Sequence, residues 1–471
     1  MDQDLALKIL LSGESAFLTG AAGAGKTYLL NQFIDKARED GKNVAVTATT
    51  GIAATHLGGN TIHAWSSLGV RDFLSSNFFL KMPESRQKTI QSADVLIIDE
   101  ISMLHSFQLD LIDSILRQVR DNLFQPFGGL QVVFAGDFFQ LPPITRKNES
   151  LQTTTRKDKN LSLRAERSNL GVGATGLPHA MNGVRNDVND QSSFAYNSAV
   201  WRELDPTILY LTAQWRQDDA EFLDILNKIR AGEIRRADAE KVAARLNAKL
   251  DDAKGEITIL ETHNVAVDRI NDKKLAEING DEKVFYRQKT GRKEYVERLA
   301  KSCLAPEPLV LKKGALVMAL KNDQKQRFVN GSIGEVIGFD KNKLNYPIVK
   351  FRNGFTVTVE PDEWDLTDGE NQLASITQIP LRLAYAITVH KSQGMTLDAA
   401  RINLARVFEA GMGYVALSRV KSLNSLSITG LNSAAFAVNP EVLEKDKEFR
   451  ERSKADVERF AHLKKKNKRR K

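Results

Sequence analysis

The sequence predicts an α/β protein with parallel sheets, and three observations support this fold class. Residues 44–48 (VAVTA), 95–99 (VLIID) and 131–135 (QVVFA) are short apolar runs of the type buried on both faces of a parallel sheet. Residues 27–40 place apolar side chains at helical spacing, as a helix packed on such a sheet requires. The composition is that of a globular protein, because 42% of the 471 residues are hydrophobic and 27% are charged.

A second αβ series with an insertion is predicted further along the chain. The series consists of residues 207–212 (TILYLT), a helix around 222–230, and strands at 257–260, 381–388 and 425–430. Between them, residues 346–360 alternate around Asn353-Gly354, which is a strong hairpin signal. Together with residues 314–320 and 332–339, this hairpin predicts a small β-barrel inserted into the second αβ domain.

Two segments are predicted to lie outside the packed core. Residues 147–195 are polar, poor in aromatic residues and rich in Gly, Asn and Ser, so we expect a long loop or a disordered insertion. Residues 433–471 predict a charged helix followed by a basic tail. The last ten residues hold seven Lys or Arg and no acid, so the remainder accounts for only +1 of the net charge of +8. For the tail, nucleic-acid binding, solubility and a localisation signal all remain open.

Several classes of protein are excluded. Cys303 is the only cysteine, which rules out disulfide scaffolds, four-cysteine zinc sites and iron–sulfur clusters held within one chain. No apolar run approaches the roughly 18 residues of a membrane-spanning helix. The N-terminus has no basic leader. We therefore expect a cytoplasmic protein that makes no membrane contact.

The first motif with a chemical meaning is a complete GxxxxGK[ST] phosphate loop, formed by Gly20, Ala21, Ala22, Gly23, Ala24, Gly25, Lys26 and Thr27. It follows a predicted strand end and opens a predicted helix, which is the setting that the motif requires. Backbone N–H groups then face the phosphates at the positive end of the helix. Lys26 is expected to reach the β- and γ-phosphates of ATP, and Thr27 to ligate Mg²⁺.

Two further motifs would complete a hydrolytic site. Asp99 ends the strand 95–99, where it is expected to hold Mg²⁺ beside Thr27, and Glu100 is placed to deprotonate the attacking water. Acidic pairs at strand ends are common, and only the phosphate loop makes this one informative. Gln140, in GDFFQLPP after the strand 131–135, is expected to contact the γ-phosphate and that water.

Several segments together resemble one family. TGAAGAGKT, TATTGIAA, IIDEISM, GDFFQLPP, WRQDD and VHKSQGMT…YVALSRV occur in the order found in PIF-family DNA helicases of superfamily one, subgroup B. The resemblance runs from Gln3 to about Leu431. It implies two RecA-like phosphate-loop motor domains, a small wedge insertion and an SH3-like β-barrel insertion. The implied boundaries are 1–146 for motor domain 1 (wedge 69–93), 147–195 for the polar insertion, 196–290 and 376–432 for motor domain 2, 291–375 for the barrel, and 433–471 for the charged helix and tail.

The resemblance also assigns residues around the nucleotide. Gln3 resembles the adenine-reading glutamine of these helicases, and Gly394 is expected near the nucleotide. Arg216 resembles the arginine that reaches the γ-phosphate from the second motor domain, and Arg419 resembles the second such arginine finger. For either arginine alone, a surface salt bridge is the competing interpretation.

The implied DNA contacts are short polar, basic and backbone groups that follow strands. They are Thr49, Thr50, Gly51, His63, Asn264, His390, Lys391 and Ser392, with Gln393 in the same segment. Trp65 could stack on a base, but core packing is the more common role of such a residue. His63 and His390 could likewise be buried histidines.

The resemblance implies an ATP-dependent DNA helicase that moves 5′-to-3′ on single-stranded DNA. Its expected partners are ATP, Mg²⁺, single-stranded DNA and single/double-strand junctions, and we expect a nucleoid-associated monomer. Two alternatives remain open: a helicase-like subunit of a RecD-type recombination nuclease, and a DNA-stimulated ATPase or remodeller that does not unwind. The short stretch before Gln3 argues against the first, because it leaves no room for a partner-binding domain there.

Overall fold

The computed structural model describes residues 1–143 and 194–464, apart from residues 70, 251–256, 304, 324, 326, 329, 369, 370 and 398. Most of the predicted insertion 147–195 and nearly all of the basic tail lie outside the described residues. The last two residues of the predicted insertion are an exception. Phe194 and Ala195 are buried, and Phe194 stacks on Tyr196 with ring centroids 5.3 Å apart. The polar insertion was therefore predicted two residues too long.

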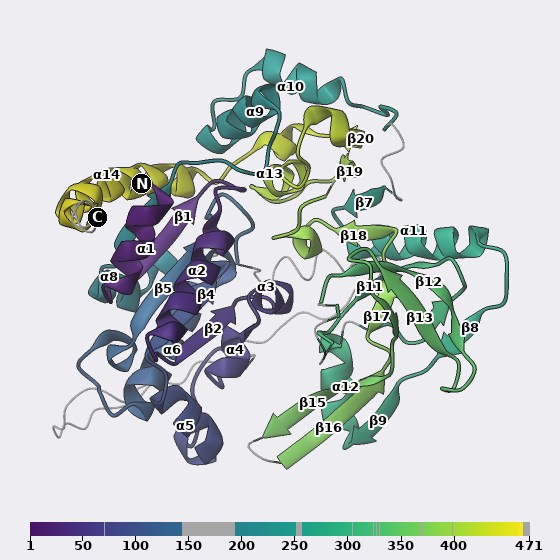
Figure 1. Ribbon diagram of the computed structural model, residues 1–471, viewed down its shortest axis with the longest axis horizontal. Helices are drawn as coiled ribbons and strands as arrows, with labels where there is room; N and C mark the ends of the chain where they lie inside the picture. Colours follow the sequence, from purple (N-terminus) through teal and green to yellow (C-terminus); the bar gives the residue numbers. More distant parts are fainter. Residues whose placement is uncertain are drawn as a thin grey trace, which may run out of the picture.

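The first sheet has six strands in the order β3-β2-β4-β5-β1-β6, and every pairing in it is parallel. Figure 1 labels four of them, β1, β2, β4 and β5. Its strands are β1 (Ala16–Gly20), β2 (Val44–Ala48), β3 (Asn60–Thr61), β4 (Val95–Asp99), β5 (Gln131–Gly136) and β6 (Thr207–Leu211). The α/β class and the three buried strands predicted from the sequence are confirmed. Parallel strands bring their carboxyl ends to one edge, so the ends of β1, β4 and β5 meet there.

The placement of β6 corrects a prediction. Residues 207–212 were expected to open the second αβ series, but β6 pairs in parallel with β1, with Ala16 opposite Thr207 and Gly20 opposite Leu211. The edge strand β6 is covered by helix α14 (Pro440–Arg459). The N–H groups of Ile208 and Tyr210 donate to Asp456 Oδ2 and Ser453 Oγ, so that side chains of α14 satisfy the open edge.

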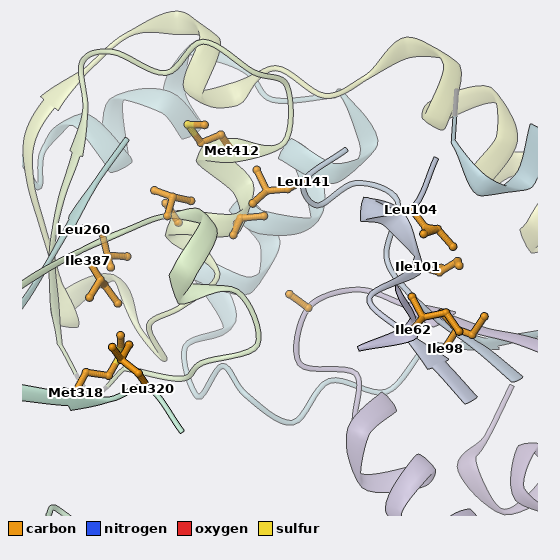
Figure 2. Packing of buried hydrophobic residues seen from close by; sticks show 14 of the residues in the cluster. Ile62, Ile98, Ile101, Leu104, Leu141, Leu260, Met318, Leu320, Ile387 and Met412 are labelled. Carbon is orange, nitrogen blue, oxygen red and sulfur yellow. The ribbon is translucent and has the colours of Figure 1, made fainter. Parts of the chain in front are cut away.

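Helices cover both faces of this sheet. Successive residues of β1 and β4 point to opposite faces, with Phe17 and Ile98 in one hydrophobic cluster and Leu18 and Ile97 in another. Helices α1 (Gln3–Leu11) and α2 (Lys26–Glu39) pack on the second cluster, whereas α6 (Ser106–Val119) and α8 (Ala199–Leu204) pack on the first. The first cluster continues into the other half of the molecule, where Figure 2 labels Leu260, Met318, Leu320 and Ile387.

The second parallel sheet has the order β18-β7-β19-β20. Its strands are β7 (Thr258–Glu261), β18 (Ala386–Thr388), β19 (Ala400–Leu404) and β20 (Leu426–Leu431), and the helices near it are α9 (Ala220–Ala231), α10 (Arg236–Ala243), α11 (Asn264–Glu277) and α13 (Met412–Leu417). The predicted strand 381–388 is two strands. Its first part, β17 (Leu381–Leu383), pairs antiparallel with β11 (Leu316–Ala319), and only β18 belongs to the parallel sheet.

The inserted region is antiparallel, as expected. A five-stranded sheet has the order β14-β13-β12-β11-β17, with β12 (Ile333–Asp340), β13 (Tyr346–Phe351) and β14 (Thr356–Thr358). The hairpin at Asn353-Gly354 is confirmed, since Lys350 pairs with Thr356 and Gly354 has φ of 95°. The same region also contains β8 (Lys283–Phe285), β9 (Gln288–Gly291), α12 (Lys293–Ser302), β10 (Leu309–Leu311), β15 (Asp362–Asp368) and β16 (Asn371–Gln378).

Short helical pieces connect these elements. They are α3 (Gly51–His56), α4 (Ile62–Trp65), η1 (Phe79–Lys81), α5 (Glu84–Gln91), η2 (Ile101–Met103), η3 (Pro126–Gly129), η4 (Ala195–Asn197), η5 (His390–Ser392), η6 (Leu423–Ser425), η7 (Ser433–Phe436) and α15 (Ala461–Lys464). Within the described part of the chain, every helix is too short or too polar to cross a bilayer.

Candidate active site

The phosphate loop connects β1 to α2 in the conformation that the motif requires. Gly23 and Gly25 have φ of 88° and 84°, which places both in the left-handed region. A Cβ atom on Gly23 would lie 2.6 Å from Arg216 Cβ, so glycine also permits the close approach of that segment. Lys26 Nζ donates to Gly20 O at 2.8 Å and to Ala21 O at 3.2 Å, and burial lowers its pKa. The ammonium group is thus held inside the loop, where phosphate oxygens would replace the carbonyl acceptors.

Two carboxylates face this lysine from the end of β4. Burial raises the pKa of Asp99 to about 7, and the charge of Glu100 adds to the rise. Burial also raises the pKa of Glu100, while Lys26 and Arg419 oppose that shift. Glu100 has φ of 54°, a left-handed conformation that is strained for a non-glycine residue. A partly buried carboxylate pair of this kind favours a cation beside it.

The donor set fits Mg²⁺. Asp99 and Thr27 supply a carboxylate and a hydroxyl, which are the hard oxygen ligands that Mg²⁺ prefers, and the rest of its shell is normally water and phosphate. Among the residues whose placement is described, no cluster of three or more His, Cys, Asp or Glu side chains could hold a metal ion by protein ligands alone. A site for Mg²⁺ would therefore rest on Asp99 and Thr27 together with a nucleotide.

A cleft of about 460 Å³ lies in front of the phosphate loop. It is lined by Ala22, Gly23, Ala24, Gly25, Lys26, Thr27, Glu100, Gln140, Trp215, Arg216, Asp218, Gly394, Thr396, Arg419 and Lys421. The structure thus brings together the predicted phosphate loop, base, glutamine and both arginines, and Gly394 lies at the same opening.

The two arginines are held close together by one short segment. Arg216 Nη1 donates to Ser418 O at 3.1 Å, and Arg419 Nε donates to Val415 O at 2.8 Å. Burial, together with the charge of Arg216, lowers the pKa of Arg419 to about 9. An anion bound between two neighbouring guanidinium groups at the mouth of a phosphate loop would reduce their electrostatic repulsion.

The position of Arg216 differs from the prediction. It was expected to come from the second motor domain, but its segment leaves the first sheet directly from β6. The backbone N–H of Trp215 also donates to Gly23 O at 3.0 Å, which ties the segment to the phosphate loop. Only Arg419, which follows α13 beside the second sheet, is carried by the opposite side of the cleft.

Glutamine amides surround the cleft with unused hydrogen-bonding capacity. The Oε1 atoms of Gln140, Gln214, Gln217 and Gln393 are buried without a hydrogen-bond partner among the described residues. Buried polar atoms are normally paired, so a ligand at this site is the straightforward explanation. Gln3 Nε2 lies 3.4 Å from both Ala24 O and Gly25 O, which places this amide against the loop, and its role in reading adenine stays a prediction.

Sequence reasoning missed three contacts here. The indole of Trp215 is 70% exposed and lines the cleft beside Gly25. The hydroxyl of Tyr414 accepts a hydrogen bond from Ala22 N at 3.0 Å. The amide of Gln393 donates to Glu100 Oε2 at 3.0 Å. Trp215 is the first residue of the WRQ motif, so the sequence did carry a signal for it, whereas the other two contacts join residues 392 and 293 positions apart.

The predicted DNA contacts fall into two groups. In the first group, Thr49 and Thr50 follow β2, and Gly51 is exposed at the start of α3. Thr49 Oγ1 donates to Glu100 O at 2.9 Å, and Thr50 Oγ1 accepts from Ala53 N. His63 lies on α4, and burial lowers its pKa. Trp65 is buried, which confirms its assignment to the core.

The second group surrounds η5 at the end of β18. Lys391 Nζ lies 3.5 Å from Oδ1 of the exposed Asn264, and burial lowers the pKa of Lys391 to about 8. His390 lies 3.9 Å from Glu409, and burial lowers its pKa. Ser392 is fully buried and its hydroxyl donates to Val389 O, so this structure exposes neither its side chain nor its backbone to a partner outside the protein.

Comparisons with known proteins agree with this geometry. A family model described as PIF1-like helicase matches residues 4–162, and one for the 2B domain of DNA helicase Pif1 matches residues 294–339. The chain is 39% identical to an ATP-dependent DNA helicase Pif1 of Psychrobacter sp., covering 96% of this chain and 71% of that protein. It is 33% identical to human PIF1, covering 94% of this chain but only 62% of that protein.

The solved structures similar to this chain are also Pif1 helicases. A Pif1 helicase from Candida albicans matches with a TM-score of 0.81 at 33% identity, covering 95% of this chain and 98% of that one. A Bacteroides Pif1 bound to single-stranded DNA matches with a TM-score of 0.73 at 30% identity, covering 97% of this chain and 98% of that one. The chain belongs to the PIF1-like helicase family.

Proposed function

We propose that this protein is an ATP-dependent DNA helicase that translocates 5′-to-3′ on single-stranded DNA. One observation carries the proposal: a single cleft brings together Lys26, Glu100, Gln140, Arg216 and Arg419 from both sides. The cleft therefore holds residues suited to bind the phosphates of ATP, to activate water and to stabilise the transferred phosphoryl group.

The residues divide the work of hydrolysis. Lys26 would bind the β- and γ-phosphates, and Glu100 would take the proton of the attacking water. Thr27 and Asp99 would hold Mg²⁺, which when bound neutralises charge on the phosphate oxygens. Arg216 and Arg419 would stabilise the charge that develops on the γ-phosphoryl group. Because Arg419 stands across the cleft from the loop, this step would require the cleft to close.

DNA would lie across the carboxyl ends of both parallel sheets. Phosphates would meet Thr49, Thr50, Gly51 and His63 on one side, and the backbone groups of η5 with Lys391 and Asn264 on the other. Alternation of these two grips with each nucleotide cycle would advance the protein along the strand. The Bacteroides relatives were solved with single-stranded DNA and with ADP-AlF3, which supports this arrangement.

The finer organisation is part of the proposal. The two motor domains would be RecA-like, residues 69–93 would form the wedge, and the antiparallel insertion within 291–375 would be an SH3-like barrel. A monomer would suffice for movement, and DNA binding would associate the protein with the nucleoid. The 5′-to-3′ polarity rests on family membership, because the same parts can run in either direction.

Strand separation by the purified chain tests the proposal. Duplexes with only a 5′ or only a 3′ single-stranded tail are incubated with ATP and Mg²⁺, and DNA-stimulated ATP hydrolysis is measured in parallel. We expect unwinding of the 5′-tailed duplex alone. Unwinding of the 3′-tailed duplex would overturn the polarity. Hydrolysis without unwinding would favour a remodeller or a subunit that needs partners.

A further inference from the structure

We propose that Gln393 is a positioning residue that restrains the catalytic carboxylate of Glu100 until DNA engages the adjacent turn η5. The inference rests on the proposed function, because it takes Glu100 as the base and η5 as a DNA contact. It assigns to Gln393 the coupling between DNA binding and ATP hydrolysis.

The contact crosses the cleft. Gln393 directly follows η5 beside the second sheet, and its Nε2 donates to Glu100 Oε2 at 3.0 Å at the end of β4 in the first sheet. The Gln393 residue is only 7% exposed, and its Oε1 has no hydrogen-bond partner among the described residues. The amide is therefore fixed mainly through the carboxylate that it holds.

The other proposed DNA segment reaches the same carboxylate residue. Thr49 Oγ1 donates to Glu100 O at 2.9 Å, and Thr49 N donates to Asp99 O at 3.1 Å. Glu100 is thus held through its backbone by the segment after β2 and through its side chain by the residue after η5. A DNA strand that contacts both segments would therefore act on both the backbone and the side chain of Glu100.

The hydrogen bond has a chemical consequence. A general base needs a free oxygen lone pair directed at the water, and a hydrogen bond from an amide N–H both occupies the oxygen and makes it a weaker base. The same turn also holds an arginine finger, because Arg419 Nη1 donates to Ser392 O at 3.4 Å and to Met395 O at 3.3 Å. A phosphate that shifts η5 would release Glu100 and reposition Arg419 together.

Replacing the donor tests the restraint. Gln393→Met keeps the length of the side chain but removes the amide. We expect ATP turnover without DNA to rise about tenfold, so the ratio of DNA-stimulated to DNA-free turnover falls by the same factor. Gln393→Asn, whose amide is one methylene too short, should behave in the same way. The ratio is measured within one preparation and does not depend on the fraction of folded protein.

Gln131→Met is the matched control. Gln131 also donates through Nε2, to Leu10 O and Glu14 O, and its Oε1 is likewise buried without a partner among the described residues, but it lies far from the cleft at the start of β5. In Gln131→Met, the ratio of DNA-stimulated to DNA-free turnover should equal that of the wild type. An unchanged ratio in Gln393→Met, or an equal fall of both rates, would overturn the proposal and leave Gln393 a packing role.

A double-mutant cycle shows whether Gln393 acts through Glu100. In a Glu100→Gln background, where hydrolysis is lost, Gln393→Met should not raise turnover without DNA, because the base that it restrains is gone. A tenfold rise in DNA-free turnover in that background would contradict the mechanism. Unwinding by the wild type is assayed separately: its absence would refute the helicase function while leaving the Gln393 result valid, and wild-type turnover that ignores DNA would refute the coupling.

Discussion

The two arginines at the cleft should give equal catalytic losses but unequal losses of stability when each is replaced by alanine. Both guanidinium groups are placed to stabilise charge on the transferred phosphoryl group, and a contact of this kind contributes about 1000-fold or more to turnover. That factor corresponds to about 4 kcal/mol of transition-state stabilisation. Affinity for ATP should change far less, because the charge develops mainly in the transition state.

The structural surroundings of the two side chains are very different. Arg419 is 1% exposed and donates to Val415 O at 2.8 Å, to Ser418 Oγ at 2.9 Å and to two further carbonyls at 3.3–3.4 Å. Arg419→Ala leaves buried acceptors unpaired, and we expect a loss of about 2–4 kcal/mol in the free energy of unfolding. Arg216 makes one 3.1 Å bond to Ser418 O and repels Arg419, so Arg216→Ala should change stability by less than about 1 kcal/mol.

Three measurements separate these effects. Single-turnover hydrolysis at saturating ATP and DNA gives the catalytic loss, equilibrium binding of a nucleotide gives the affinity, and urea unfolding gives the stability. Because Arg216→Ala stays folded, its turnover is the cleaner test of the finger role. Equal losses of turnover and affinity in Arg216→Ala, or near-normal turnover, would refute the finger role and support an ordinary salt bridge or packing role.

Three further predictions concern single features of the site and chain. Lys26→Ala should abolish both turnover and unwinding in a folded protein, whereas Glu100→Gln should retain ATP binding and lose hydrolysis, and DNA-stimulated turnover in Lys26→Ala would contradict this. Burial lowers the pKa of Lys391 to about 8, so its charge, and with it the phosphate contact that we propose, should be lost as pH rises from 7 to 9. The slope of log affinity for single-stranded DNA against log salt should then become shallower by about 0.7, an effect that Lys391→Arg should remove because arginine stays charged. Residues 147–193 lie outside the described residues, and replacing them with a short Gly/Ser linker should preserve DNA-stimulated ATPase activity, because loop length costs only about 0.6 kcal/mol per doubling.

The sequence predicted those parts of the site that local spacing determines. The phosphate loop lies within eight consecutive residues, and the strand before it and the helix after it are encoded by their own apolar patterns. Asp99 and Glu100 follow from the end of a single buried run. In each case one segment of chain contains both the signal and the chemistry, so no knowledge of tertiary pairing is needed.

Local sequence patterns could not predict which distant strands pair with each other. The run TILYL is equally suited to either sheet, and what selects β1 as its neighbour includes the cover supplied by α14, more than 200 residues later in the chain. The same holds for residues 381–388, which divide between two sheets because the chain leaves the antiparallel region at Ala384-Tyr385. An apolar run predicts a buried strand but does not identify the neighbouring strand.

The position of β6 changes how closure of the cleft can be understood. Trp215 N donates to Gly23 O on the phosphate loop, whereas the Arg216 side chain donates to Ser418 O on the opposite side. We expect opening of the cleft to break the side-chain contact and to leave Arg216 with the loop. Arg419 Nη1 donates to Ser392 O of η5, so we expect Arg419 to move together with η5 and Gln393. A DNA strand bound at η5, as we propose, would therefore act on Arg419 and, through Gln393, on Glu100. ATP would then bind before Arg419 reaches the phosphoryl group, whereas hydrolysis would wait for Arg419.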